Sequence, residues 1–101
     1  MKTLFAVTLV KGEGWNESEP MRSQEKWNEH AAFMDELAAN GFVVLGGLVG
    51  DGEDTVLLAV DADDESEIRV AFAKDPWFAL QIRKIDQIQR WTILLQAGGK
   101  A

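Results

Sequence analysis

The apolar residues of this chain fall into short blocks separated by polar stretches, and the spacing inside each block predicts its secondary structure. Residues 3–10 (TLFAVTLV), 42–49 (FVVLGGLV) and 55–61 (TVLLAVD) are rich in β-branched and aromatic side chains, which is typical of strands. The polar residues 50–53, which join the second and third runs, favour a hairpin turn. A last strand is expected within residues 81–96.

The longest block has helical spacing. We expect a helix that begins near Ser18 or Ser23 and runs to Asn40, with Gly41 ending it in the left-handed conformation. Its acidic residues lie mainly off the apolar stripe, as in a helix that packs on a core. The stripe follows the i, i+3, i+4, i+7 rhythm and comprises Trp27, His30, Ala31, Met34, Leu37 and Ala38.

A shorter helix is expected after the third strand. Asp63 or Asp64 can cap its start, and Pro76 stops it. Its apolar side is formed by Ile68, Ala71 and Phe72. The order of elements along the chain is therefore βαββαβ.

This order predicts the fold. In a chain of 101 residues it is typical of an α+β protein, the ferredoxin-like βαββαβ sandwich, in which two helices cover one face of a four-stranded antiparallel sheet. Residues 1–101 are expected to form a single domain, because a chain of this length has no room for a second core. A frayed tail is expected at residues 97–101.

The other face of the predicted sheet needs a cover. The runs VVL (43–45), VLLAV (56–60) and TILL (92–95) do not alternate apolar and polar residues, as strands with one face in water do. Two helices on one side leave the second face bare. We therefore expect this open face to pack against a second copy of the chain in a two-fold homodimer.

Composition and charge exclude several kinds of chemistry and argue against some classes of partner. The absence of cysteine excludes disulfides and thiolate chemistry, and with a single histidine we do not expect a transition-metal site. The net charge of −7 argues against nucleic acid and anionic membrane surfaces as partners. The apolar run at residues 4–10 is too short for a signal peptide core or a membrane span, so a cytoplasmic location is expected.

His30 is the leading candidate for proton transfer near neutral pH, because it is the only histidine and the chain has no cysteine or tyrosine. It lies on the apolar stripe of the first helix. An imidazole at such a position is either a core group bonded to a carbonyl or a reactive group that lines a pocket.

The string Asp75, Pro76, Trp77, Phe78 provides a possible partner for His30. Proline disfavours the helical conformation for Asp75, so its carboxylate can turn toward the sheet beside two aromatic rings. A carboxylate that accepts a hydrogen bond from an imidazole fixes its tautomer and stabilises its charged form. In the alternative interpretation, Asp75 caps backbone amides of the turn while His30 bonds a carbonyl.

The four tryptophans and two adjacent glycines complete the candidates. Trp15, in a polar loop, is either a lid over a pocket or a loop anchor packed on the first helix, whereas Trp27 and Trp91 are expected in the core. Gly46 and Gly47 indicate a bulge or the close approach of a backbone or ligand.

Several of these strings together resemble the YciI-like (YCII-related) family. They are WNEHAAFMDELAANGFVVLGG, the hairpin with its apolar third strand, DPW, and RWTILL, and the likeness spans about residues 4–95. The resemblance implies a dimeric α+β barrel without cofactors and an active site centred on His30 and Asp75. Leu48 stands where many members carry proline, so the edge of the pocket is expected to differ.

The function implied by this resemblance is acid–base chemistry by His30, oriented by Asp75, on a small cyclic organic substrate. One relative is a dehydrochlorinase of a chlorinated hydroxyquinol, which suggests a lyase or isomerase type of step. The residues expected to contact the substrate are Trp15, Trp27, Gly47 and Trp77. Two alternatives remain open: a non-catalytic dimer that binds a small aromatic metabolite, and an accessory protein with no pocket.

Overall fold

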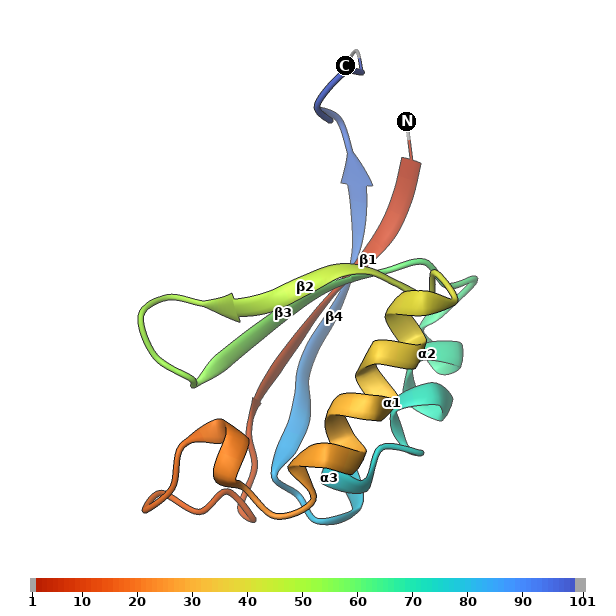
Figure 1. Ribbon diagram of the computed structural model, residues 1–101. Coiled ribbons are helices and arrows are strands. Elements are labelled where there is room, and N and C mark those ends of the chain that lie inside the picture. The colour runs from red at the N-terminus through yellow and green to blue at the C-terminus, as the bar shows by residue number, and fades with distance from the viewer. Residues whose placement is uncertain (1, 100–101) are drawn as a thin grey trace.

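The computed structural model of the chain describes residues 2–99, which form a four-stranded sheet with helices packed on it (Figure 1). The elements in chain order are β1 (Lys2–Lys11), the 3-10 turn η1 (Met21–Ser23), α1 (Trp27–Ala39), β2 (Val43–Val49), β3 (Thr55–Val60), α2 (Glu65–Phe72), α3 (Pro76–Ala79) and β4 (Arg83–Ile93). Of the tail predicted to fray, residues 100–101 lie outside the described residues.

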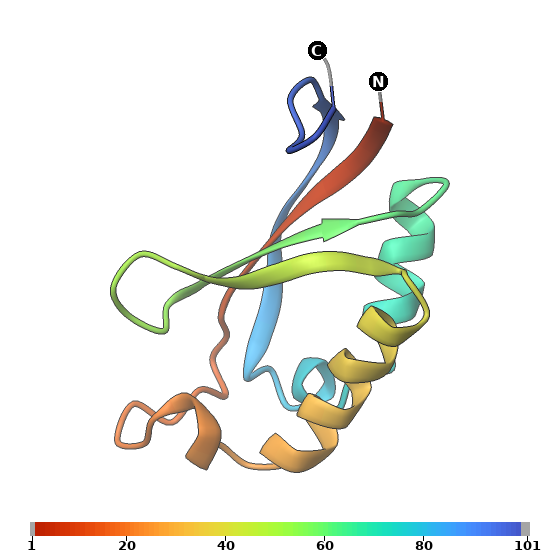
Figure 2. The same ribbon diagram turned by 45° about the horizontal axis from the view of Figure 1, so that its top comes forward.

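The sheet has the strand order β2-β3-β1-β4, and every neighbouring pair is antiparallel. Both α1 and α2 lie on the same side of the sheet in the two views of Figures 1 and 2. The predicted α+β class and antiparallel sheet are confirmed, and the arrangement is compatible with a ferredoxin-like fold. No helix within residues 2–99 is long and apolar enough to cross a bilayer.

The core fills the space between the sheet and the helices. In β1 every second residue points to this side, and the directly paired residues of β3 and β4 join it; Val7, for example, lies opposite Leu58 and Ile88. Each large apolar side chain buried here contributes roughly 1.5–3 kcal/mol. The buried cluster consists of Phe5, Val7, Leu9, Val43, Leu58, Val60, Ile68 and Phe72.

The first helix begins at Trp27, so both predicted starts, Ser18 and Ser23, were wrong. Lys26 precedes it with a left-handed φ of 57°, which separates α1 from the turn at η1. The helix ends as predicted, because Gly41 has a φ of 83° and donates its N–H to the carbonyl of Ala38.

The predicted apolar stripe of this helix is only partly correct. His30 is its one buried member, and Ala38 is exposed. Phe33, which lies outside the stripe, packs against the core with Met34 and Leu37. The face of α1 that packs on the sheet is therefore rotated about the helix axis relative to the predicted stripe.

The second predicted helix is found as α2, and a further short helix, α3, begins at Pro76. Asp64 caps α2 by accepting the N–H of Glu67 at 2.9 Å, as expected for one of the two candidates. Pro76 does more than stop a helix, because it occupies the first position of α3 behind Asp75. This short helix follows the end of α2 closely and carries the DPW string to the start of α1.

The side of the sheet away from the helices remains open. Trp91 lies there opposite Leu4 and is 37% exposed, so its predicted place in the core is wrong for the single chain. Leu45 and Val49 of β2 are exposed on the same face.

The register of β2 shifts between Val43 and Leu45, before the two glycines. Gly46 and Gly47 pair regularly with Leu58 and Leu57, so the bulge predicted at these glycines is not found there.

Two glycines allow the loop after β1 to lie directly on the start of β4. A Cβ on Gly12 would stand 2.1 Å from the carbonyl oxygen of Gln81, and one on Gly14 would stand 2.0 Å from that of Leu80. Gly12 and Gly14 donate their N–H groups to Ile82 and Gln81 at 3.0 and 2.9 Å. This contact holds the loop that carries Trp15 against α3.

We expect Gly14→Ala to destabilise the protein by about 1–3 kcal/mol, because a side chain there forces two backbone segments apart. Gly52→Ala is the matched control, since nothing lies within 4 Å of an added Cβ and the backbone there is not left-handed. The control should change the free energy of unfolding by no more than about 0.5 kcal/mol. Urea denaturation measures both values, and equal losses would contradict the close approach.

Candidate functional site

The structure brings His30 and Asp75 into direct contact. Nδ1 of the imidazole lies 2.7 Å from Oδ2 of the carboxylate, although the two residues are 45 positions apart. The contact joins the first half of α1 to the start of α3. Asp75 is 1% exposed and His30 9%, so the hydrogen bond is shielded from water. A short, buried imidazole–carboxylate bond is the strong, charge-assisted kind.

The second oxygen of Asp75 has a structural task. Oδ1 accepts the backbone N–H of Trp77 at 2.9 Å and so caps α3. The two interpretations considered for Asp75 are thus combined in one side chain, since it caps the turn and bonds His30. Because one oxygen is held by the helix, the direction of the other oxygen toward the imidazole is fixed.

Trp77 holds the plane of the imidazole. The rings of His30 and Trp77 are stacked with centroids 3.8 Å apart and an angle of 4° between the planes. Trp77 is fully buried, and its indole Nε1 donates to the carbonyl of Glu25 at 2.6 Å. The imidazole is therefore restrained by a hydrogen bond in its plane and by a ring against its face.

The remaining nitrogen of His30 is directed to the surface. Within residues 2–99, the only hydrogen bond of the ring is through Nδ1, and no buried side-chain nitrogen or oxygen lacks a partner. Nε2 therefore belongs to the 11% of the side chain that is exposed. With Asp75 accepting from Nδ1–H, the neutral ring offers a lone pair at Nε2. This nitrogen can take a proton from a bound molecule.

Trp15 is a buried anchor, so its interpretation as a lid was wrong. It is 8% exposed and meets Trp77 edge to face at 6.2 Å. It packs on Trp77 of α3, in a cluster that Trp27 of the first helix also borders. Because Trp15 and Trp77 cover each other, they support the imidazole from behind and present no open wall to a ligand.

Trp27 lies beside the exposed edge of the site. Its ring is half-buried, 5.8 Å from the ring of His30 and 5.7 Å from that of Trp77. Of the four residues expected to contact substrate, it is the one that combines proximity to His30 with partial exposure.

Gly47 lies apart from these residues. It pairs with Leu57 in the sheet and borders a groove on the open face that also includes Leu45 and Trp91. None of the residues around His30 lines that groove. The structure thus gathers His30, Asp75 and three tryptophans, but does not bring Gly47 to them.

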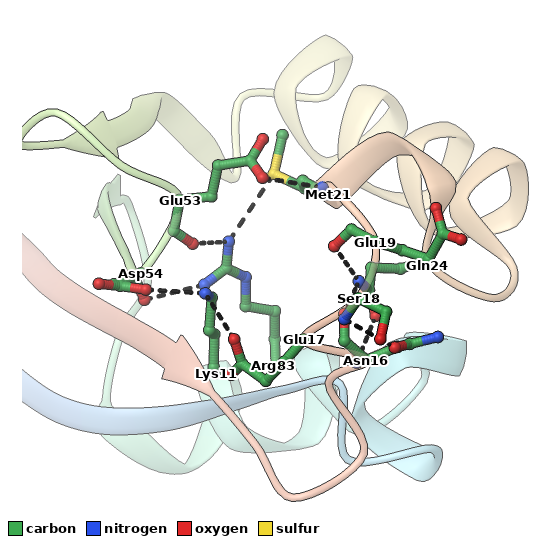
Figure 3. A network of polar contacts seen from close by, with 10 residues as sticks. All are labelled: Lys11, Asn16, Glu17, Ser18, Glu19, Met21, Gln24, Glu53, Asp54 and Arg83. Carbon is green, nitrogen blue, oxygen red and sulfur yellow. Dashed lines mark hydrogen bonds and ion pairs between the residues drawn. The ribbon is translucent and has the colours of Figure 1, made fainter.

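Two supporting residues were missed from the sequence. Arg83 is 1% exposed and donates to the carbonyls of Asp54 and Glu53 at 2.9 and 2.6 Å (Figure 3). Its guanidinium lies 4.7 Å from the ring centre of Trp15. It thereby connects the β2–β3 hairpin to the aromatic cluster. Nothing in its local sequence distinguishes a buried arginine, because its partners are backbone carbonyls about 30 residues away.

Gln24 is the second missed residue. It is buried and closes its loop by accepting the N–H of Asn16 and donating to the carbonyls of Asn16 and Glu19 (Figure 3). These bonds fix residues 16–24, which lead directly into α1. No signal in the sequence distinguishes Gln24, because it stands in a loop whose residues are mostly polar.

The charged groups at this end of the molecule stabilise one another. Burial lowers the pKa of Arg83, against the nearby carboxylates of Glu53 and Asp54, which raise it. At the exposed rim, the hydrogen bond between Lys11 and Asp54, 2.8 Å long, raises the pKa of Lys11 and lowers the pKa of Asp54. The raised pKa of Lys11 and the lowered pKa of Asp54 keep these two groups charged near neutral pH.

Within the described residues, no group of three His, Cys, Asp or Glu side chains is arranged to hold a metal ion.

Comparison with known proteins finds no family model that matches the chain, and no curated protein or solved structure that matches it significantly. The interpretation of the site therefore rests on its geometry.

We expect Asp75→Asn to reverse the tautomer of His30. The N–H of Trp77 requires an oxygen at the position of Oδ1, so the amide nitrogen of the new side chain must face Nδ1 and donate to it. The ring proton then moves to Nε2, which can no longer accept.

Long-range ¹H–¹⁵N NMR spectra of the single histidine distinguish the two tautomers without assignment. We expect an Nδ1–H ring in the unchanged protein and an Nε2–H ring in the variant at a pH where the imidazole is neutral. The same tautomer in both proteins would contradict the contact.

Proposed function

We propose that the protein is a cofactor-independent acid–base catalyst in which His30 transfers a proton and Asp75 orients and stabilises it. The observation that carries the proposal is the 2.7 Å contact between Nδ1 and the buried carboxylate, with Nε2 left toward the surface. A general base needs this combination of a fixed tautomer, a fixed ring plane and one free nitrogen.

The proposed step is proton abstraction from an acidic carbon of a small cyclic substrate. The C–H bond breaks, Nε2 takes the proton, and the electron pair either forms an enolate or expels a leaving group such as chloride from the neighbouring carbon. The imidazolium formed in this step is stabilised by the carboxylate of Asp75. Return of the proton at another carbon gives an isomerase, and loss of the leaving group gives a lyase.

The substrate class follows from the surroundings of Nε2. Trp27 is the half-buried neighbour of the imidazole at the surface, and the flat face of an indole suits a planar or cyclic organic molecule. This class agrees with the substrates implied by the resemblance to the YciI-like family.

A second candidate is a non-catalytic protein in which the same pair only holds α1 and α3 together. It is favoured by the burial of Trp15 and Trp77 and by the cavities of the described residues, none of which is lined by His30. In that case Nε2 is bonded to water and no substrate binds.

Hydrogen–deuterium exchange separates the two candidates. A panel of cyclic ketones, lactones and chlorinated ring alcohols is incubated with the protein in D₂O and followed by ¹H NMR for exchange at carbon or release of chloride. For at least one compound class, we expect the unchanged protein to exceed His30→Gln by at least about 10²-fold, as is typical for loss of a general base.

The control variant is Asn28→Gln, which changes an exposed polar residue of the same helix outside the site. It should retain the full rate. Equal rates for the unchanged protein and His30→Gln with every compound would favour the non-catalytic candidate.

We also propose that the open face of the sheet packs against a second copy of the chain. Support comes from Leu45, Val49 and Trp91, which are 68%, 50% and 37% exposed on that face, a large apolar area for a protein surface. The ends of β1 and β4 extend this face beyond the helices (Figures 1 and 2). A two-fold pairing of the same face with itself covers both copies at once.

Sedimentation equilibrium at micromolar concentration should give twice the mass of the chain. Leu45→Lys places a charge in the proposed interface and should shift the protein toward the monomer. Val70→Lys is the matched control, because Val70 is 63% exposed but lies on α2, on the helical side. A monomeric unchanged protein, or equal dissociation of both variants, would refute this pairing.

A further inference from the structure

A cavity of about 490 Å³ lies between the α2–α3 segment and the start of β4, and the proposed catalytic pair does not contribute to it. Its volume is within the range of small-molecule sites, which is about 300–1,000 Å³. Phe78 and Ala79 of α3, Ala73 after α2, and Ile85 of β4 border it. Gly12 and Glu13 of the loop after β1 complete its edge.

The inner wall of this cavity is apolar and firmly supported. Phe78 stacks on the fully buried Phe72 with ring centroids 5.6 Å apart, and Ile85 packs against the core. Ala73 and Ala79 are small, so the hollow exists because no large side chain fills it. A hydrocarbon chain or ring placed here would be removed from water along one side.

Cationic residues stand at the border of this apolar wall. Arg69 is four residues before Ala73 and therefore lies on the same side of α2. Its partner Glu65 is 3.5 Å away, and both side chains are more than half exposed, so the ion pair is weak and can be exchanged.

Lys84 also borders the cavity, but it pairs with Val10 in the sheet, whereas its neighbour Ile85 pairs with the core residue Leu9. The side chain of Lys84 therefore leaves β4 on the opposite face.

The local charge contrasts with that of the whole protein. Arg69, Lys84 and Arg83 line the cavity together with a single acidic residue, Glu13, although the chain carries a net charge of −7. The guanidinium of Arg83 is already bonded to the carbonyls of Glu53 and Asp54. The cation available to a ligand is thus Arg69.

We propose that this cavity binds a small apolar carboxylic acid, with its hydrocarbon part against Phe78 and Ile85 and its carboxylate beside Arg69. An apolar wall with positive charge at one border matches an amphipathic anion and disfavours a cation or a neutral polar molecule. The site is separate from the catalytic pair, because α3 directs Trp77 to His30 and the next residue, Phe78, to the cavity.

The test uses octanoate and its uncharged counterpart 1-octanol as probes, followed by ¹H–¹⁵N NMR of the full chain. Octanoate should shift the amide signals of Phe78, Ala79 and Ile85 with a Kd in the low millimolar range, as expected for a ligand of about ten heavy atoms. Octanol should bind at least twofold more weakly. The use of two probes separates the apolar contribution from that of the charge.

Charge variants assign the carboxylate. Arg69→Gln should weaken octanoate binding by about two- to fivefold and leave octanol unchanged. Glu65→Gln should tighten octanoate binding by about twofold, because it releases Arg69 from its partner. Lys74→Gln is the matched control, since it removes a positive charge outside the cavity lining.

A filled variant tests the location. Ala73→Met places a longer side chain at the cavity wall and should abolish the shifts of both probes, while its unfolding curve shows that it still folds. The proposal is overturned if octanoate shifts no cavity residue, if octanol binds as tightly as octanoate, or if Lys74→Gln weakens binding as much as Arg69→Gln does. None of these outcomes depends on the catalytic activity of His30.

Discussion

The carboxylate of Asp75 is the group on which the arrangement of this end of the molecule depends. One of its oxygens caps α3 and the other bonds His30 of α1. Leaving either donor without this partner would place an unsatisfied polar group in a region where Asp75 is 1% exposed. The same side chain thus sets where α3 begins and how the imidazole is turned. Few substitutions can satisfy both demands, because they require two acceptors at fixed directions.

A column of rings behind the imidazole completes this restraint. Arg83 lies over Trp15, Trp15 meets Trp77 edge to face, and Trp77 stacks on His30. Aromatic pairs of this kind contribute about 0.5–1.5 kcal/mol beyond the burial of their surface. The column reaches from the β2–β3 hairpin to α1, so the position of the imidazole is tied to parts of the chain that are distant in sequence. The close approach of Gly12 and Gly14 to β4 makes room for it.

The strands, the hairpin and the end of α1 could be predicted because their causes are local. Gly41 ends α1 by its own conformational freedom, and Asp64 caps α2 three residues away. The start of α1 could not be predicted from the same kind of signal. Ser18 and Ser23 are good capping residues, but the loop that contains them is closed by Gln24 through bonds to backbone groups several residues away.

The candidate site likewise contains residues that could be predicted from the sequence and residues that could not. The DPW string predicts an aspartate turned out of its helix, and the pattern of α1 places His30 on the buried side, so these two residues were accessible to sequence reasoning. The depth of Trp15 and the role of Arg83 were not, because both result from the packing of a polar loop on β4. The exposure of Trp91 likewise follows from a sheet face that the helices do not cover.

The asymmetry of the imidazole is the strongest reason to regard His30 as more than a core residue. Packing alone would be served at little cost by an apolar side chain of similar size, without the buried carboxylate that accompanies the imidazole. Here one nitrogen is held by a buried carboxylate and the ring face by Trp77, while Nε2 has no partner within residues 2–99. The ring of His30 is thus held in one orientation, while the hydrogen-bonding capacity of Nε2 is not used inside the protein. That capacity is then available to a molecule that approaches from the surface beside Trp27.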